Sequence, residues 1–285
     1  MKLSKGFQFT FLAALFWAIT IIITRIILKD GENALNVAFW IALLTTPYWL
    51  FVLSKKTAEF KAAIRKNYWI LIGIGLVSAI GVNLIEPFAL KYSPAVNFSL
   101  LIRSVILFTI VFAYLFLGEK ITVKKVFVSF LILTGAFLLT TDGKAITFSK
   151  GDIFTLAEAA MIALGNNVLG KIAVKRMSAD LSASGSFLIG VLPITLIAGL
   201  NNAIAIPKAP LLLILLAILA ILLIVFRFKA YQNASASYVT MIFSFTPVLV
   251  SLMAIPLLKE YMTPTQIIGG ALIILASISV EKLRI

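Results

Sequence analysis

Long apolar stretches dominate this sequence and decide what it can fold into. The chain is 61% hydrophobic and only 13% charged, whereas a soluble domain is about half apolar and a quarter charged. A run of about 18 apolar residues is long enough to cross the bilayer core. Backbone polar groups in lipid must be satisfied within the structure, which leaves helices or a closed barrel. The runs are too long for barrel strands and lack strand-like alternation, so we predict an all-α membrane protein.

Short polar segments divide the apolar sequence into ten predicted transmembrane helices. The predicted spans are Phe7–Leu28, Ala34–Leu53, Tyr68–Leu90, Val96–Leu117, Val123–Leu139, Ile153–Val174, Ala183–Leu200, Leu211–Phe228, Ser237–Leu258 and Ile267–Val280. Four prolines fall inside or near the ends of spans and are expected to kink the second, seventh and ninth helices: Pro47, Pro193, Pro247 and Pro256. The first span is too long for the apolar part of a signal peptide, so we expect it to be retained.

The basic residues indicate how the helices are oriented. With the N-terminus inside, seventeen Lys and Arg residues fall in cytoplasmic segments and seven in outer segments, while Arg103 lies inside the fourth span. This bias favours both termini in the cytoplasm and an even number of spans. The net charge of +14 is therefore interpreted as a topology signal of a multi-pass protein of the plasma membrane, and no nucleic-acid partner is expected.

Two pairs of similar segments indicate an internal duplication. SKGFQFT at residues 4–10 resembles SKGDIFT at 149–155, and LGEKIT at 117–122 resembles LKEYMT at 258–263, at offsets of 145 and 141 residues. The order of the matches predicts two five-helix repeats, residues 1–145 and 146–285. An odd number of spans places the second repeat upside down in the membrane. Inverted repeats are a frequent plan of secondary transporters, with the substrate site near the midplane between the repeats.

Longer segments of the two repeats resemble a known family. FALKYSPAVNFSLLIRSVILFTIVFAYLFLGEKIT and YQNASASYVTMIFSFTPVLVSLMAIPLLKEYMTPTQIIGGALIILAS are similar to the EamA repeat of the drug/metabolite transporter superfamily. The second copy keeps the family's proline as Pro247, whereas the first has Ile106 there, and the opening helix resembles the family's Trp-plus-basic pattern through Trp17 and Arg25. The resemblance implies ten helices in two inverted repeats. It also implies a central cavity lined mainly by helices 1, 3, 4, 6, 8 and 9.

Four ionisable residues are predicted to lie within spans, all in the outer half of the membrane: Arg25, Glu86, Arg103 and Glu158. A charge in the bilayer core costs about 2.5–3.5 kcal/mol on insertion scales, so each needs a reason. One interpretation is a polar cluster at the substrate site, with Glu86, Glu158 and Arg25 as candidates for proton coupling or gating. The alternative is a static pair between Glu86 and Arg103, with Arg25 reaching the headgroups.

Amides and aromatic rings complete the predicted substrate site. Buried Asn side chains bind polar ligand groups or link helices, and the second use is the commoner one. Aromatic side chains form apolar cavity walls or simply pack. The predicted substrate-binding residues are Trp17, Asn83, Glu86, Asn97, Arg103, Asn166, Tyr231 and Phe245.

The function predicted from these features is secondary transport of a small organic metabolite, zwitterionic or anionic, by alternating access. Export is favoured by the family resemblance alone, and the expected source of energy is a proton gradient or the substrate gradient itself. The chain has no Cys, no His and no Walker A loop, so we expect no catalysis, cofactor or metal. The predicted partners are the substrate and the bilayer, with the protein a monomer or weak homodimer. The alternatives are an accessory membrane subunit and a membrane-embedded enzyme.

Overall fold

The computed structural model describes residues 3–77, 81, 85, 89, 92–258 and 261–283, and in these ranges the chain is helical without strands. Nine helices in the described ranges are long and apolar enough to cross a membrane. The remaining predicted span, Tyr68–Leu90, begins in α3, and its end lies outside the described residues. The elements are α1 (Lys5–Lys29), α2 (Ala34–Lys55), α3 (Thr57–Val77), α5 (Ala95–Leu101), η2 (Ile102–Ser104), α6 (Val105–Leu117), α7 (Val123–Thr141), α8 (Lys150–Ile162), η3 (Ala163–Leu169), α9 (Gly170–Arg176), α10 (Ala179–Leu200), α11 (Pro210–Asn233), α12 (Ala236–Phe243), α13 (Thr246–Leu258) and α14 (Pro264–Leu283).

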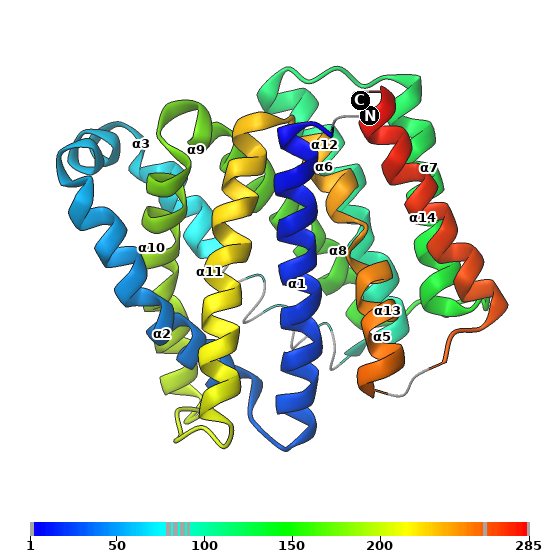
Figure 1. Cartoon of the computed structure of the whole chain (residues 1–285), viewed down its shortest axis with the longest axis horizontal. Coiled ribbons are helices and arrows are strands. Elements are labelled where there is room, and N and C mark those ends of the chain that lie inside the picture. Colours follow the sequence, from blue (N-terminus) through cyan, green and yellow to red (C-terminus); the bar gives the residue numbers. More distant parts are fainter. Residues whose placement is uncertain are drawn as a thin grey trace.

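The helices form one bundle, and both chain termini lie at the same end of it (Figure 1). We call this end, which holds Lys5 and Leu283, the termini end, and the opposite end the far end. Helix α1 runs from the termini end to the far end, whereas α8, which opens the second half, runs the other way (Figure 1). The all-α membrane fold and the two inverted five-helix repeats predicted from the sequence are confirmed.

Helix α3 begins earlier than its apolar run predicts. It starts at Thr57, not near Tyr68, and only Lys56 separates it from α2. Glu59 in the first turn is favourable at the positive end of the helix dipole. Phe60 and Ile64 then pack into the bundle one turn apart. Lys61, Arg65 and Lys66, which precede the predicted span Tyr68–Leu90, therefore lie on a helix.

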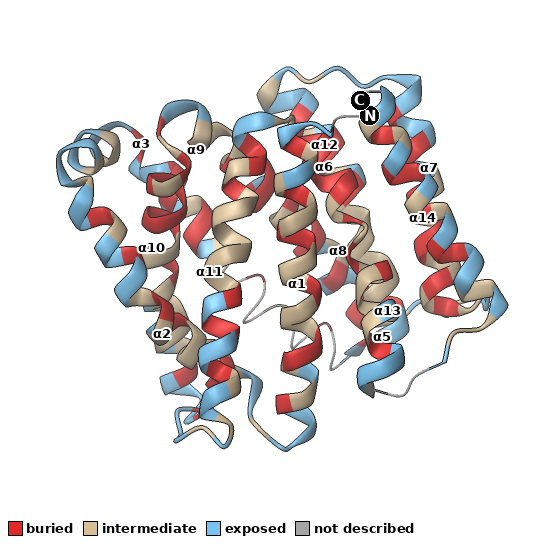
Figure 2. Cartoon of the chain, in the orientation of Figure 1, coloured by how far each residue is buried: buried red, intermediate tan, exposed pale blue. Residues whose placement is uncertain are grey.

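Most of the packing runs between the two halves. Helix α1 packs against α11, α10 packs against α2 and α3, and α7 packs against α14. In Figure 2 buried positions lie along both α7 and α14, and the two helices cross at a pair of glycines. A Cβ on Gly135 would lie 2.7 Å from the Gly269 carbonyl oxygen, and one on Gly269 would lie 2.6 Å from the Gly135 oxygen. Neither half encloses a bundle of its own.

In the described ranges, the fourth, sixth and ninth predicted spans depart from a regular α-helix. The fourth contains the 3-10 turn η2 around Arg103, and the ninth ends as α12 and resumes as α13 after Ser244 and Phe245. These two breaks are 141 residues apart, the same offset as the LGEKIT and LKEYMT segments. Pro247 explains the second break because proline has no amide hydrogen and clashes with the preceding turn. The sixth span widens into the π-helix η3, while α2 and α10 continue through their prolines.

Glu32 ties together two loops at the far end. Its carboxylate accepts hydrogen bonds from the Lys208 amide at 2.8 Å and the Asn36 side chain at 2.9 Å. These donors, the Lys208 amide first, lower the pKa of Glu32 from its ordinary value of 4.5, because they stabilise the ionised form.

The lowered pKa of Glu32 predicts a loss of stability in acid. The contribution is present above about pH 4.5 and disappears as the pH falls through the lower folded-state value. Its size is below about 1 kcal/mol because the site is exposed. Glu32→Gln is expected to reduce the change in melting temperature between pH 5 and pH 3. A wild-type change in this variant would contradict the assignment.

Candidate functional site

Arg103 lies where the fourth span is interrupted. It is eight residues from the start of α5, about 12 Å from the far end. Its Nε is buried and has no hydrogen-bond partner in the part of the chain that the structure describes. Helix α8, which carries Glu158, packs against the η2 turn. A half-buried guanidinium group is thus held at a break in a helix, where irregular backbone is tolerated next to a cavity or buried protein.

A chain of buried hydrogen bonds links three helices. The Tyr231 hydroxyl of α11 donates to Asn167 Oδ1 of η3 at 2.7 Å. Asn167 Nδ2 in turn donates to the Thr109 hydroxyl of α6 at 2.8 Å. The adjacent Gly165 lets α3 approach, because a Cβ there would lie 2.3 Å from a Val77 methyl group. Tyr231, predicted as a cavity wall, therefore also carries a polar contact, and its partner is Asn167, the neighbour of the predicted Asn166.

Lys171 binds backbone carbonyl groups at the end of α11. Its ammonium group on α9 donates to the carbonyl oxygens of Tyr231 and Ala234, the latter at 2.6 Å. The last carbonyls of a helix lack partners within the helix, and a cation there is favoured by the helix dipole. From the sequence, Lys171 counts only as one of the seventeen basic residues of the cytoplasmic segments. The structure gives it a direct bond to the backbone of Tyr231.

Arg227 is a second cation inside the bundle. Helix α11 continues to Asn233, past the predicted end at Phe228, so Arg227 lies six residues inside it, about 9 Å from the termini end. Its Nε is buried without a hydrogen-bond partner among the described residues. Tyr231 follows four residues later and shares its helix face. The sequence counted Arg227 among the cytoplasmic basic residues, and the structure places it within α11, because the polar positions after Phe228 belong to the helix.

Aromatic rings join α1 to the interrupted ninth span. Trp17 stacks on Phe243 with ring centroids 5.0 Å apart, and Phe11 lies 5.7 Å from Phe245. The backbone breaks directly after Phe243, so both rings of the ninth span flank the interruption. Trp17 and Phe245, two predicted site residues, are thus held on the same side of the bundle.

The remaining residues that were predicted for the site differ in burial and position. Glu158 and Asn166 are buried, with 2% and 8% of their surface exposed, whereas Arg25 is exposed near the end of α1. Asn97 is buried at the far end. Asn83 and Glu86 lie outside the described residues.

Asn97 belongs to a far-end junction between the two halves. Its amide donates to the Thr147 carbonyl oxygen at 2.8 Å and to Asp152 at 3.0 Å. Asp152, which is fully buried, also accepts hydrogen bonds from the Ser93 hydroxyl and from the Ser149 amide. The sequence offered one signal for this cluster, the Asp three residues after Ser149, which is the spacing of a capping box.

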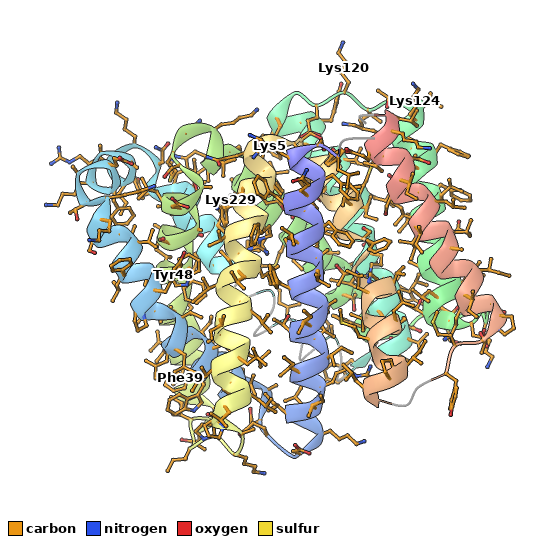
Figure 3. All side chains as sticks on the ribbon, in the orientation of Figure 1. Lys5, Phe39, Tyr48, Lys120, Lys124 and Lys229 are labelled. Carbon is orange, nitrogen blue, oxygen red and sulfur yellow. The ribbon has the colours of Figure 1, made fainter. Side chains whose placement is uncertain are left out.

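A corresponding junction closes the termini end. Glu119 accepts hydrogen bonds from the amide of Ala236 at 2.7 Å and from the hydroxyl of Ser237 at 2.6 Å, at the start of α12. Glu281 accepts from the Ser4 amide at 2.7 Å and from the Tyr238 hydroxyl. A cavity of about 500 Å³ lies beside these groups, near Lys120, which Figure 3 shows at this end. Its lining residues are Ser4, Glu119, Lys120, Lys125, Asn233, Ala234, Ser235, Tyr238 and Glu281.

The repeated Ser-Lys-Gly segments explain why the junctions correspond. A Cβ on Gly6 would lie 2.9 Å from the Ala234 side chain, directly before α12. A Cβ on Gly151 would lie 2.3 Å from the Ser93 amide nitrogen, directly before α5. Each glycine thus lets the first helix of one half touch the loop before the interrupted helix of the other half.

Comparisons with known proteins agree with this architecture. A solved crystal structure superimposes with a TM-score of 0.75 at 17% identity, over 99% of each chain, which shows the fold. An uncharacterized transporter of Archaeoglobus fulgidus is 28% identical over 290 residues, 95% of each chain. Another, from Methanothermobacter thermautotrophicus, is 30% identical over 166 residues, which are 54% of this chain and 48% of that protein.

The match to a family model covers both halves. The EamA-like transporter family model matches residues 4–141 and again residues 149–280, in line with the resemblance found in the sequence. A multi-pass membrane transporter has a small-molecule substrate and a lipid environment. By its sequence and its fold, this chain belongs to the EamA-like transporter family.

Proposed function

We propose that the protein is a secondary transporter that moves a small organic metabolite across the plasma membrane by alternating access. The observation that carries the proposal is the interruption of three spans next to polar residues inside the bundle. Arg103 lies on the first break, Asn167 on the π-helix, and Phe243 and Phe245 flank the third. Interrupted helices supply backbone and side-chain ligands at the binding sites of several transporter folds.

The substrate site combines aromatic and polar side chains from both halves. Trp17, Tyr231 and Phe245 form its apolar walls, and Arg103 and Asn166 supply polar contacts. Asn83 and Glu86 remain in the proposed site on sequence grounds. Asn97 is assigned to the far-end junction, because its amide donates to Thr147 and to Asp152.

The two end junctions are the proposed gates. The termini-end junction joins Ser4 and Glu119 to α14 and α12, and the far-end junction joins Asp152 to Ser93 and Asn97. Both connect the two halves, so opening either one requires a relative movement of the halves. Alternating access needs one junction to separate while the other stays closed.

Sidedness and energy source complete the proposal. Basic residues are concentrated at the termini end, which favours that end as the cytoplasmic one. Export is the proposed direction. Glu158 and Glu86 are the proposed proton-coupling residues, and Arg25 is the candidate gate residue.

Transport is tested by reconstitution into proteoliposomes. A panel of amino acids, organic acids and amines, supplied at two pH gradients, should include at least one compound whose uptake exceeds that of empty liposomes. Tyr231→Phe, which removes the bond to Asn167, is expected to lower that uptake about 5- to 10-fold, as the loss of about 1 kcal/mol predicts. A folded protein that moves no compound of the panel would favour the accessory-subunit alternative, whose interior needs no charged groups.

Proton coupling is tested separately. The ratio of substrate uptake at the two pH gradients is measured for wild type, Glu158→Gln and Glu86→Gln. The coupling carboxylate is the one whose replacement makes the ratio approach one, because the amide carries no proton between states. A wild-type ratio in both folded variants contradicts coupling through either carboxylate.

A further inference from the structure

In the part of the chain that the structure describes, Arg227 has no ion pair, and its guanidinium group lies 5.9 Å from the centroid of the Phe228 ring. Helices α1, α2, α9, α10 and α12 pack against α11. Their sequences contain one carboxylate, Asp180, which is 2.8 Å from Lys56 and therefore already paired. Helix α11 itself has no acidic residue. A buried polar atom without a partner needs an explanation, and a charge within the membrane is a mark of function.

Arg103 has the same property in the other half of the membrane. Its Nε is also buried without a hydrogen-bond partner in the described ranges. Arg103 lies about 12 Å from the far end and Arg227 about 9 Å from the termini end. Both side chains keep a part of their surface accessible. One guanidinium group whose buried Nε lacks a hydrogen-bond partner among the described residues thus lies in each half of the bundle.

The surroundings of Arg227 fit an anionic oxygen group. A guanidinium group binds a carboxylate through two parallel hydrogen bonds, more strongly than it binds neutral acceptors. On the same face of α11, one turn away, lies the Tyr231 ring, whose hydroxyl donates its hydrogen to Asn167 at 2.7 Å. Aromatic and amide groups at this point suit the uncharged remainder of a small organic acid.

We infer that Arg227 is an anion-binding residue in the termini half of the transport pathway, and that the substrate carries a carboxylate which Arg103 binds in the far half. The inference rests on the proposed transport function and narrows its substrate class to organic acids, amino acids included. A carboxylate that leaves one guanidinium group meets a second before it reaches the end of the bundle.

The test uses purified full-length protein in detergent and matched probes that share one side chain. The probes are L-leucine, isocaproate, isoamylamine and their phenyl counterparts L-phenylalanine, 3-phenylpropionate and phenethylamine. Without probe, Arg227→Gln is expected to melt at or above the wild-type temperature, because it removes a buried unpaired charge. At least one carboxylate probe should raise the wild-type melting temperature by a few degrees, while the amines should not. Arg227→Gln should lose this response.

Lys229→Gln is the matched control, because it removes one positive charge from the same helix end and its ammonium group lies over the Phe226 ring. It should keep the wild-type response. The inference would be overturned if the amines stabilised the wild type, if no carboxylate probe did, or if phosphatidylglycerol stabilised it and the carboxylates did not. It would also be overturned if Arg227→Gln without probe melted several degrees below wild type. Uptake of an amine or a neutral metabolite at equal rates by wild type and Arg227→Gln would overturn it and leave the transport function standing.

Discussion

Gly151→Ala is expected to destabilise the protein by at least about 1–3 kcal/mol, the usual effect of overpacking. The added Cβ would lie 2.3 Å from the Ser93 amide nitrogen, 2.4 Å from the Tyr92 carbonyl carbon and 2.7 Å from the Ala89 oxygen. All three are backbone atoms, so no side chain can rotate away. The start of α8 must then move from the far-end junction and weaken the hydrogen bonds of Asp152. Thermal unfolding in detergent measures the effect.

Gly270→Ala is the control for this substitution. Gly270 also lies in a helix, but a Cβ there meets nothing within 4 Å, and alanine is favoured over glycine in a helix by about 1 kcal/mol. The control should melt at or slightly above the wild-type temperature. Gly6→Ala should fall between the two, because its Cβ meets the Cβ of Ala234 at 2.9 Å. A Gly151→Ala protein with wild-type stability would show that the far-end junction is not tightly packed.

Glu119→Ala is expected to cost about 2–3 kcal/mol and to open the termini end. One carboxylate accepts hydrogen bonds from the first amides of α12 and from the Ser237 hydroxyl, and lies 3.4 Å from the Lys125 ammonium group. Hydrogen bonds to a charged acceptor are worth about 1.5–3 kcal/mol, and a helix N-terminus favours an anion. Without the carboxylate, α12 loses its attachment to the loop after α6.

The opening is measured by labelling a single cysteine. Because the chain has no cysteine, Asn233→Cys, in the lining of the termini-end cavity, would react alone with a maleimide. Glu119→Ala should raise the labelling rate several-fold. Glu59→Ala, which removes an exposed carboxylate of α3, should not. Equal labelling rates in both backgrounds would show that Glu119 does not hold the termini end closed.

The sequence predicts the spans well because long apolar runs have one stable arrangement in lipid. It is less informative at helix ends. Helix α3 begins at Thr57 because the turn before its apolar run is amphipathic and packs through Phe60. Helix α11 continues past Phe228 because Lys171 satisfies its last carbonyls, and this contact joins residues about sixty positions apart.

The candidate site was only partly predictable for a related reason. Depth within a span singled out Arg103, and aromatic residue type singled out Tyr231 and Trp17. The position of Arg227 in the sequence did not mark it as a site residue, since a basic residue near a predicted helix end is usually a topology signal. The bond of Tyr231 to Asn167 depends on two helices meeting 64 residues apart in sequence, and one sequence contains no information on such a pairing.

The contacts between the halves also bear on how the protein is made. Gly6 contacts Ala234, Thr109 contacts Asn167, and Glu119 contacts Ala236, so each contact joins an early residue to one synthesised much later. The ribosome delivers the first member of each pair to the membrane well before the second. The amino-terminal helices must therefore remain in the bilayer with these faces against lipid or insertion machinery, and the bundle can close only after α11 and α12 have been synthesised.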